Sequence, residues 1–461
     1  FRWEDISTQQ QTLLGSELVL NYLRGNKSNE LSNGGALRNR NYLLGDIINS
    51  APAFVSTPVQ RYPDDWGSNP ETNAPYSSFK ATHLNRQPLV YVGANDGMLH
   101  AFNADTGTEW FAYVPGLVYP NLSDLTNPNY THKYYVDGSP TVVDAFINSQ
   151  WRTILVSGRG AGGQGIFALD VTSPSDFVSE DTAASRVLWE FSDIDDRDLG
   201  YTFGQPSIVR LQNGKWAALF SGGYNNIVDN NNDGATDDSL TGNAILFLVD
   251  IESGELIRKI DTEVGVNEDP TGQSRPNGLA TPAAVDVDGD FIVDYVYAGD
   301  LFGNMWKFDL TSNSPSNWGV AYSSGTEPVP LFKACFGNTC NSSNIQSITT
   351  RPQVVRHPTS NGFLILFGTG KYLEAGDNSV SNQTTQSFYA IWDKRQDELI
   401  TFDRSSLLEQ SILQEVTVDG TSYRATSDNS INWTNDLGWY IDLLSPNTSD
   451  NLGERQVSNS I

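Results

Sequence analysis

The amino-acid sequence predicts an all-β fold, namely a β-propeller of about seven blades with a short helix at its N-terminus. Three observations predict it. Beyond residue 42, short apolar runs alternate with Gly, Asn, Asp and Pro, which is the pattern of many short antiparallel strands. One strand-turn-strand phrase recurs along the chain, and helical spacing is confined to the first residues.

The N-terminal segment carries the helical pattern. Apolar residues recur at helical spacing up to Leu23, and Gly25 ends the pattern. Residues 26–41 are polar and rich in Asn and Gly, as is typical of a linker. We therefore expect a helix and linker over residues 1–42 and the propeller domain over residues 43–461. The apolar positions of the helix are Leu13, Leu14, Leu18, Val19, Tyr22 and Leu23.

Internal similarity is the main evidence for a propeller. Residues 91–107 and 297–311 share one order: an apolar strand, a glycine turn, a second strand with an aromatic residue, and a turn led by Asp or Asn. One such unit cannot bury both of its faces, whereas stacked units can. All copies together suggest roughly six to eight blades, and we expect seven. Weaker copies occupy residues 156–170, 220–254 and 367–393, and less regular ones 137–147 and 417–443.

Four proline-containing phrases each precede an apolar run, at residues 45–52, 137–140, 204–206 and 280–282. Proline lacks an N–H group, so at the first residue of a strand it costs no ladder hydrogen bond. We expect each phrase to introduce the innermost strand of a blade.

The charge balance narrows the classes of partner. The chain has 461 residues with 28 Lys and Arg against 55 Asp and Glu, a formal net charge of −27. This charge repels phosphate backbones, so nucleic acid is excluded as an expected partner. The same carboxylates suit divalent cations, although a solubilising surface explains most of them equally well.

The chain contains two cysteines, Cys335 and Cys340, and the nearest histidine is His357. Two cysteines alone cannot complete a tetrahedral zinc site, so we expect a small disulfide and an oxidising compartment. The alternative is two unrelated thiols. No apolar stretch is long enough to span a membrane, and no signal peptide precedes Phe1, so we expect a fragment of a longer exported protein.

The sharpest motif is a candidate calcium loop at residues 229–237. Calcium takes six to eight oxygen ligands, and oxygen-bearing side chains stand at loop positions 1, 3, 5 and 9, with Gly234 at the turn. Leu240 occupies the position at which such loops usually have a bidentate acid. We therefore expect Asp237, or else Asp238, to complete the coordination sphere of the ion. The alternative is a metal-free Asn/Asp/Gly turn. The expected ligands are Asp229, Asn231, Asp233, Ala235 through its carbonyl, and Asp237.

A second loop keeps the same spacing with Asp286, Asp288, Asp290 and Asp294, but Phe291 stands where glycine is expected. A bulky residue at positive φ is unfavourable. A turn in which the Asp side chains accept backbone N–H bonds therefore competes with metal binding here.

No catalytic set is evident, so we expect no enzyme. The histidines His83, His100, His132 and His357 are dispersed, and His100 lies inside a repeat strand, where a hydrogen-bonded structural role is expected. The Gly-rich residues 160–165 lack the helix that follows a nucleotide loop, so they predict a flexible hairpin.

Two sets of residues resemble known families. Residues 91–114 resemble quinoprotein-type propeller repeats, in modified form. Together with residues 44–52, 295–309, 368–372 and 453–455, they are more similar to the C-terminal β-propeller of the PilC/PilY family of type IV pilus tip-associated biogenesis proteins.

This resemblance implies an exported protein of the periplasm, outer membrane and pilus tip, with an adhesive module preceding the propeller. In that family a calcium loop governs pilus extension and retraction, and so adhesion and twitching motility. Residues 229–237 match that loop. The implied partners are minor pilins and other pilus tip proteins, with a host or abiotic surface as adhesive target. The sequence lacks the Arg-Gly-Asp tripeptide of some members, so integrin binding does not transfer.

Two other functions remain open at this point. A quinone-dependent dehydrogenase would use the same fold, but its adjacent cysteines are missing, and only residues 101–110 approximate its tryptophan-docking repeat. A passive scaffold for envelope assembly is hardly separable from a calcium-switched factor by sequence.

Overall fold

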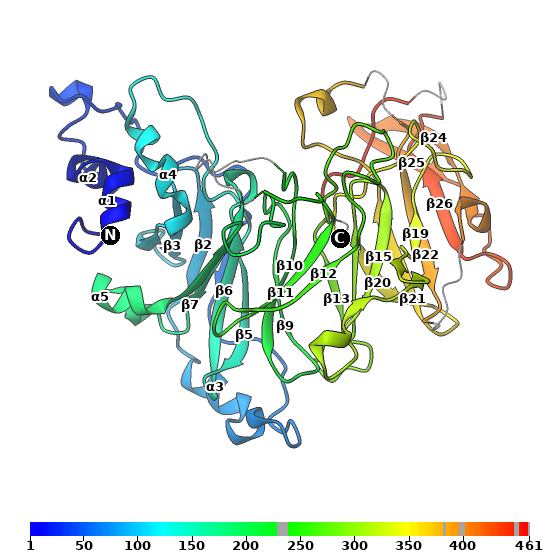
Figure 1. Ribbon diagram of the computed structural model, residues 1–461, viewed down its shortest axis with the longest axis horizontal. Helices are drawn as coiled ribbons and strands as arrows, with labels where there is room; N and C mark the ends of the chain where they lie inside the picture. The colour runs from blue at the N-terminus through cyan, green and yellow to red at the C-terminus, as the bar shows by residue number, and fades with distance from the viewer. Residues whose placement is uncertain (228–237, 381–383, 396–401, 447–450, 460–461) are drawn as a thin grey trace. The chain divides into compact units, whose positions relative to one another are not determined.

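The computed structural model describes residues 1–227, 238–380, 384–395, 402–446 and 451–459. These residues divide into two compact units (Figure 1). The first unit comprises residues 1–220, with 226–239 and 248–257, and the second comprises residues 221–225, 240–247 and 258–461. Strands predominate in both units, as expected.

The N-terminal segment forms two helices instead of the single expected one. These are α1 (Thr8–Leu14) and α2 (Glu17–Leu23). Ser7 and Gln10 form a capping box at the start of α1, and Gly15 ends it at φ 78°, a conformation that glycine adopts without steric cost. The apolar spacing continues across this break, which explains why it resembles one helix.

Three further short helices were not expected from the sequence: α3 (Tyr76–Thr82), α4 (Tyr119–Leu122) and α5 (Glu180–Ala183). The latter two are single turns in connecting segments, too short to show helical periodicity.

The first unit holds two antiparallel four-stranded sheets, with strand orders β1-β2-β3-β4 and β5-β6-β7-β8. Consecutive strands are neighbours in both, as in a meander. The strands are β1 (Ala53–Val55), β2 (Leu89–Ala94), β3 (Met98–Asn103), β4 (Glu109–Tyr113), β5 (Thr141–Ile147), β6 (Gln150–Gly158), β7 (Gly165–Asp170) and β8 (Val187–Ser192).

A third sheet has the order β12-β11-β10-β9. Its strands are β9 (Ser207–Arg210), β10 (Trp216–Ser221), β11 (Ile245–Asp250) and β12 (Leu256–Asp261). All six residues of β10 and of β11 are buried, so both faces of these strands are covered.

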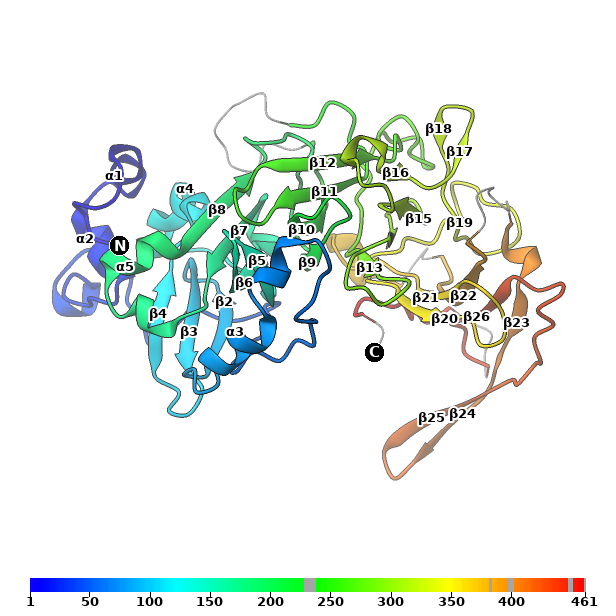
Figure 2. The ribbon, with the colours of Figure 1, turned by 90° about the horizontal axis from the view of Figure 1, so that it is seen from below.

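The second unit holds two five-stranded sheets and two hairpins. The fourth sheet has the order β13-β14-β15-β16 with β19 beside β15, and the fifth has the order β20-β21-β22-β26-β23. Figure 2 shows the hairpin β24–β25 extending away from the fifth sheet. The strands are β13 (Ala283–Val285), β14 (Tyr295–Gly299), β15 (Asn304–Asp309), β16 (Gly319–Val320), β17 (Ser323–Ser324), β18 (Glu327–Pro328), β19 (Phe332–Lys333), β20 (Gln353–Arg356), β21 (Phe363–Gly368), β22 (Ser387–Asp393), β23 (Leu408–Gln410), β24 (Ile412–Val418), β25 (Thr421–Thr426) and β26 (Gly438–Asp442).

The described residues thus form five blade-like sheets, instead of the expected seven or so. The two less regular sequence copies are parts of sheets already counted. Residues 137–147 supply β5 of the second sheet, and residues 417–443 supply part of the hairpin β24–β25 and strand β26. A lone strand and a hairpin carry the same alternation of apolar runs and turn residues as a full repeat.

The four proline-containing phrases fulfil their expected role as strand starts. Strands β1, β5, β9 and β13 each begin directly after one of them, and each is the edge strand that opens its sheet. The cysteines also pair as expected, because Cys335 and Cys340 form a disulfide.

A buried carboxylate organises the turn between β14 and β15. Asp300 is fully buried and accepts hydrogen bonds from the side chains of Asn277 (2.9 Å), Asn304 (2.8 Å) and Trp306 (2.8 Å). The backbone N–H groups of Phe302 and Asn304 also donate to it, both at 2.9 Å. Five donors converge on one side chain, so this carboxylate fixes the local geometry of the repeat.

Replacing Asp300 by Asn should therefore destabilise the second unit. The new amide would point a donor at groups that are themselves donors, leaving buried N–H groups unpaired, at a cost of about 3 kcal/mol in the free energy of unfolding. Urea unfolding measures this. The exposed Asp419 in the β24–β25 turn gives the control Asp419→Asn, and equal stability of the two variants would contradict the role of Asp300.

Candidate functional site

The predicted calcium ligands Asp229, Asn231, Asp233, Ala235 and Asp237 lie outside the described residues. The residues that flank this loop are described. Ser239 N donates to Asn226 O at 2.8 Å, and both side chains are buried. Asp198 binds both flanks, because its carboxylate accepts from Ser239 Oγ at 2.5 Å and its carbonyl accepts from Asn226 Nδ2 at 3.2 Å. The two ends of the loop are therefore held together.

The second acidic loop brings three of its four carboxylates together. Oxygen atoms of Asp286, Asp288 and Asp294 lie within 4.8 Å of one another, close enough to bind one cation. Asp290 is not part of this group, and its Oδ1 accepts from Ile292 N at 2.8 Å.

The same loop also contains the backbone hydrogen bonds expected of a metal-free turn. Asp286 accepts from the N–H groups of Gly289 (2.6 Å) and Phe291 (2.8 Å), and Asp294 accepts from Val287 N at 2.8 Å. Partial burial raises the pKa of Asp294, and the neighbouring carboxylates raise it further. A cation would relieve this repulsion.

Phe291 occupies the glycine position of this loop at φ 68°. A left-handed conformation is costly for a bulky residue, on the order of 1–3 kcal/mol. The loop thus has the positive φ that the spacing of its Asp residues implies at this position, although the residue there is Phe291 and not glycine.

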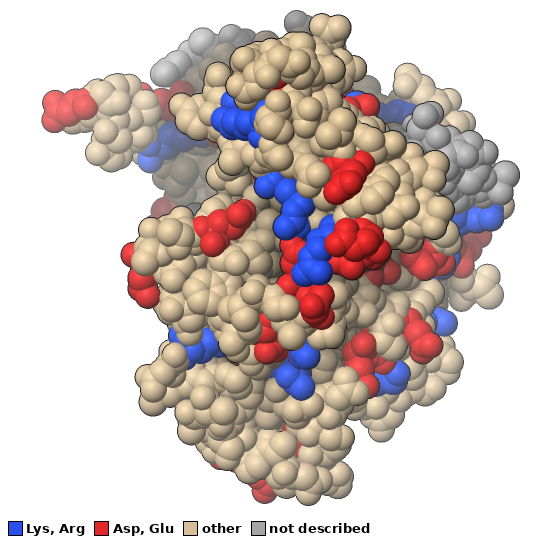
Figure 3. All heavy atoms as spheres, turned by 90° about the vertical axis from the view of Figure 1, so that its left-hand side faces the viewer, with Lys and Arg blue, Asp and Glu red and all other residues tan. Residues whose placement is uncertain are grey.

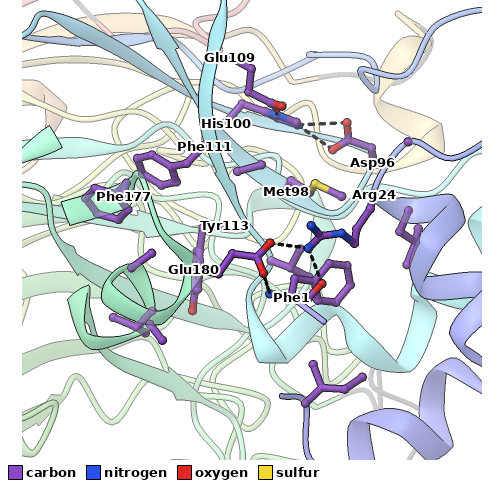
Figure 4. A pocket seen from close by; sticks show the side chains of 18 of the residues that line it. Phe1, Arg24, Asp96, Met98, His100, Glu109, Phe111, Tyr113, Phe177 and Glu180 are labelled. Carbon is purple, nitrogen blue, oxygen red and sulfur yellow. Dashed lines mark hydrogen bonds and ion pairs between the residues drawn. The ribbon is translucent and has the colours of Figure 1, made fainter. Parts of the chain in front are cut away.

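A cavity of about 950 Å³ lies in the first unit, beside strands β3 and β4 (Figure 4). Its walls are largely apolar and include Met98, Phe111 and Phe177, and the rings of Phe111 and Phe177 stack at 3.9 Å. Its lining residues come from elements spread over the first unit, namely α1, α2, α4, α5, β3, β4, β7 and β8 and the segments between them, and no single sequence motif marks it. Sequence reasoning therefore missed it.

His100 lies at one end of this cavity, held between two carboxylates (Figure 4). Its Nδ1 is 2.7 Å from Glu109, and its Nε2 is 3.1 Å from both oxygens of Asp96. Burial alone lowers the pKa of His100, but the hydrogen bonds with Asp96 and Glu109 outweigh it and raise the pKa to about 9. These hydrogen bonds confirm the structural role that was expected of His100.

Ion pairs line another part of the cavity, away from His100 (Figure 4). Glu180 pairs with Arg24 and with Arg2, both at 2.6 Å. Figure 3, which shows the side of the molecule that is on the left in Figure 1, has basic and acidic side chains next to one another near its centre. These groups are more than a third exposed, so each pair contributes little to stability.

The other histidines are dispersed, as predicted. His132 is exposed beside Asp46, whereas His357 packs against Trp392 and Trp433. In the Gly-rich segment, residues 160–164 lie between β6 and β7 and begin with a short 3-10 turn, and Gly165 is the first residue of β7.

The match to a known family decides the identity of the fold family. Residues 44–422 match the family described as the PilY1 beta-propeller domain. The chain belongs to the PilY1 β-propeller family. This membership confirms the predicted fold class and the resemblance seen in the sequence.

Two relatives are longer proteins named as PilY1 or as its homolog. A "Type IV pilus biogenesis factor PilY1 homolog" of Xylella fastidiosa is 41% identical over 451 residues, covering 95% of this chain and 28% of the relative. The "Type IV pilus biogenesis factor PilY1" of Pseudomonas aeruginosa strain PAK is 36% identical over 490 residues, covering 96% and 39%. The chain therefore spans well under half the length of these relatives.

The crystal structure of the P. aeruginosa PilY1 C-terminal domain is also similar. It has a TM-score of 0.70 and 33% identity, and the match covers 89% of this chain and 80% of that one. Within the described parts of the chain, helices are all too short or too polar to cross a membrane.

The pKa of His100 generates a pH prediction. A histidine whose pKa rises from 6.5 to about 9 on folding adds stability that is complete below pH 6.5 and lost as pH rises through 9. The stability advantage of the wild type over His100→Gln should fall by about 3 kcal/mol between pH 6 and pH 9.5.

Urea unfolding at both pH values measures this difference. The variant His132→Gln serves as control, because removal of an exposed imidazole changes stability little. A wild-type advantage that stays constant over this range would contradict the charged state assigned to His100.

Proposed function

We propose that this chain is the propeller part of a type IV pilus biogenesis and adhesion factor that acts at the pilus tip on the cell surface. The observation that carries the proposal is the family match over residues 44–422, together with relatives named as type IV pilus biogenesis factors. The expected partners are minor pilins and other tip proteins, and a host or abiotic surface. We expect a binding and regulatory module and no enzymatic activity.

Export fits the chemistry of the chain. A disulfide between Cys335 and Cys340 persists in an oxidising compartment such as the periplasm or the cell surface. The net charge of −27 keeps the domain away from nucleic acid and anionic lipid.

We further propose that calcium binding at residues 229–237 regulates pilus extension and retraction. The donor set of three carboxylates, one amide and a backbone carbonyl suits a hard cation. The hydrogen bonds that join Asn226, Ser239 and Asp198 support this proposal, because they bring the two ends of the loop together without an ion. Mutual repulsion among the carboxylates would oppose closure without the ion, so calcium would act as a switch.

The cluster of Asp286, Asp288 and Asp294 is a second place where a cation could bind. Its backbone hydrogen bonds hold it in shape without an ion, so we assign the regulatory role to the first loop.

A domain exchange tests the proposed function. In P. aeruginosa cells lacking PilY1, a PilY1 carrying this chain in place of its own propeller should restore surface pili and twitching. The match in fold and family is the reason for this expectation. Counts of surface pili and the width of twitching zones are the measurements.

Two variants of the exchanged protein separate its roles. Asp233→Ala should leave the protein folded but make piliation insensitive to calcium, whereas Asp288→Ala should behave as the unaltered exchange. A folded, exported exchange protein that restores no pili would refute the pilus role. Calcium-sensitive piliation in Asp233→Ala cells would instead refute the regulatory role of the loop at residues 229–237.

A further inference from the structure

A polar and aromatic hollow of about 630 Å³ lies on the fifth sheet, at the base of the hairpin β24–β25. Its apolar surface comes from Trp433, Trp439, Ile431 and Ile441, and its polar surface includes Asp428 and Ser430. Neither the calcium loops nor the cavity beside His100 shares any of these residues.

The floor of the hollow follows from the alternation of strand β26. Trp439 and Ile441 are two residues apart, so their side chains leave the same face of the sheet, and both are half-buried. Tyr440 between them points to the opposite face, where it is buried near Tyr389. An aromatic and an aliphatic side chain are thus presented outward.

The opposing wall is held by side-chain contacts within the chain. Trp433 packs edge-on against His357, with ring centroids 4.3 Å apart, and also against Trp392. Beside it, Gln410 Oε1 accepts from Ser427 Oγ at 2.6 Å and from Asn429 N at 3.0 Å. These contacts fix the wall before any ligand binds, which lowers the entropic cost of binding.

Several polar groups that line the hollow have no hydrogen-bond partner in the described part of the chain. They are the indole N–H groups of Trp433 and Trp439, the carboxylate of Asp428 and the hydroxyl of Ser430. Many indole N–H groups elsewhere in the chain are used internally, since those of Trp110, Trp151, Trp189, Trp306, Trp318 and Trp392 donate to protein oxygens. The hollow therefore combines aromatic faces with open donors and acceptors.

We propose that this hollow binds a neutral saccharide. A pyranose ring has apolar C–H faces and a rim of hydroxyl groups, which match indole faces beside free donors and acceptors. The lining contains no Lys or Arg, and Asp428 carries a negative charge, so anionic sugars are disfavoured. The carboxylate of Asp428 would accept hydrogen bonds from sugar hydroxyls, and the indoles would donate to sugar oxygens.

This inference does not rest on the pilus role, although it would supply a ligand class for adhesion. Binding is measured on the purified chain in solution, so a failure there leaves the domain-exchange result untouched.

The test is titration of the purified chain with cellotetraose, maltotetraose and the tetramer of N-acetylglucosamine, followed by calorimetry and saturation-transfer NMR. At least one neutral probe should bind. Its affinity should fall about tenfold or more in Asp428→Ala, because a hydrogen bond to a charged group is lost. Trp433→Phe and Trp439→Phe, which keep the apolar platform but remove the N–H donor, should also weaken binding.

Two controls make the result decisive. Asp419→Asn removes an exposed charge outside the hollow and should leave affinity unchanged, and tetragalacturonic acid should not bind. The proposal is overturned if no neutral probe binds the wild type at about 10 mM, a concentration that detects even weak sugar affinities. It is also overturned if the three hollow variants bind as the wild type does.

Discussion

The central strands of this chain are buried on both faces, and the rest of the structure follows from that constraint. Every residue of β7, β10 and β11 is buried. A strand covered on both sides is largely apolar and leaves few positions for a functional side chain. Function is thereby restricted to loops, sheet edges and outward faces, which is where the acidic loops, the cavity beside His100 and the hollow at Trp439 occur.

Several charged side chains that enter these interiors are held in hydrogen-bond networks or ion pairs. Asp300 collects five donors, and Lys307 pairs with Asp393 at 2.9 Å with both side chains nearly fully buried. Arg210 pairs with Glu71 at 2.7 Å under the same conditions. Such pairs add little net stability compared with apolar replacements. Removal of one partner, however, leaves the other charge buried and unpaired, so the pairs disfavour alternative packing of each repeat.

Much of the fold could be predicted from the sequence, because repetition and strand periodicity are local signals. The strand starts after the proline-containing phrases and the family were predicted from such local patterns, and the disulfide was predicted from the two cysteines of the chain. The number of blades was not predicted correctly, since a single strand such as β5 carries the same pattern of apolar and turn residues as a complete repeat. The pairing of His100 with Glu109 and the hollow at Trp433 and Trp439 depend on contacts between separate elements, which no spacing along the chain reveals. The predicted ligands at residues 229–237 remain a prediction.

The central claim is that a rigid all-β scaffold carries one loop closed by calcium, and hydrogen–deuterium exchange with and without calcium tests it most directly. Peptides covering residues 229–237 should exchange more slowly in millimolar calcium, because an ion that binds the folded loop suppresses its opening. Peptides from β7 should be unaffected, since that strand is already buried. Unchanged exchange over residues 229–237 in millimolar calcium would contradict the account.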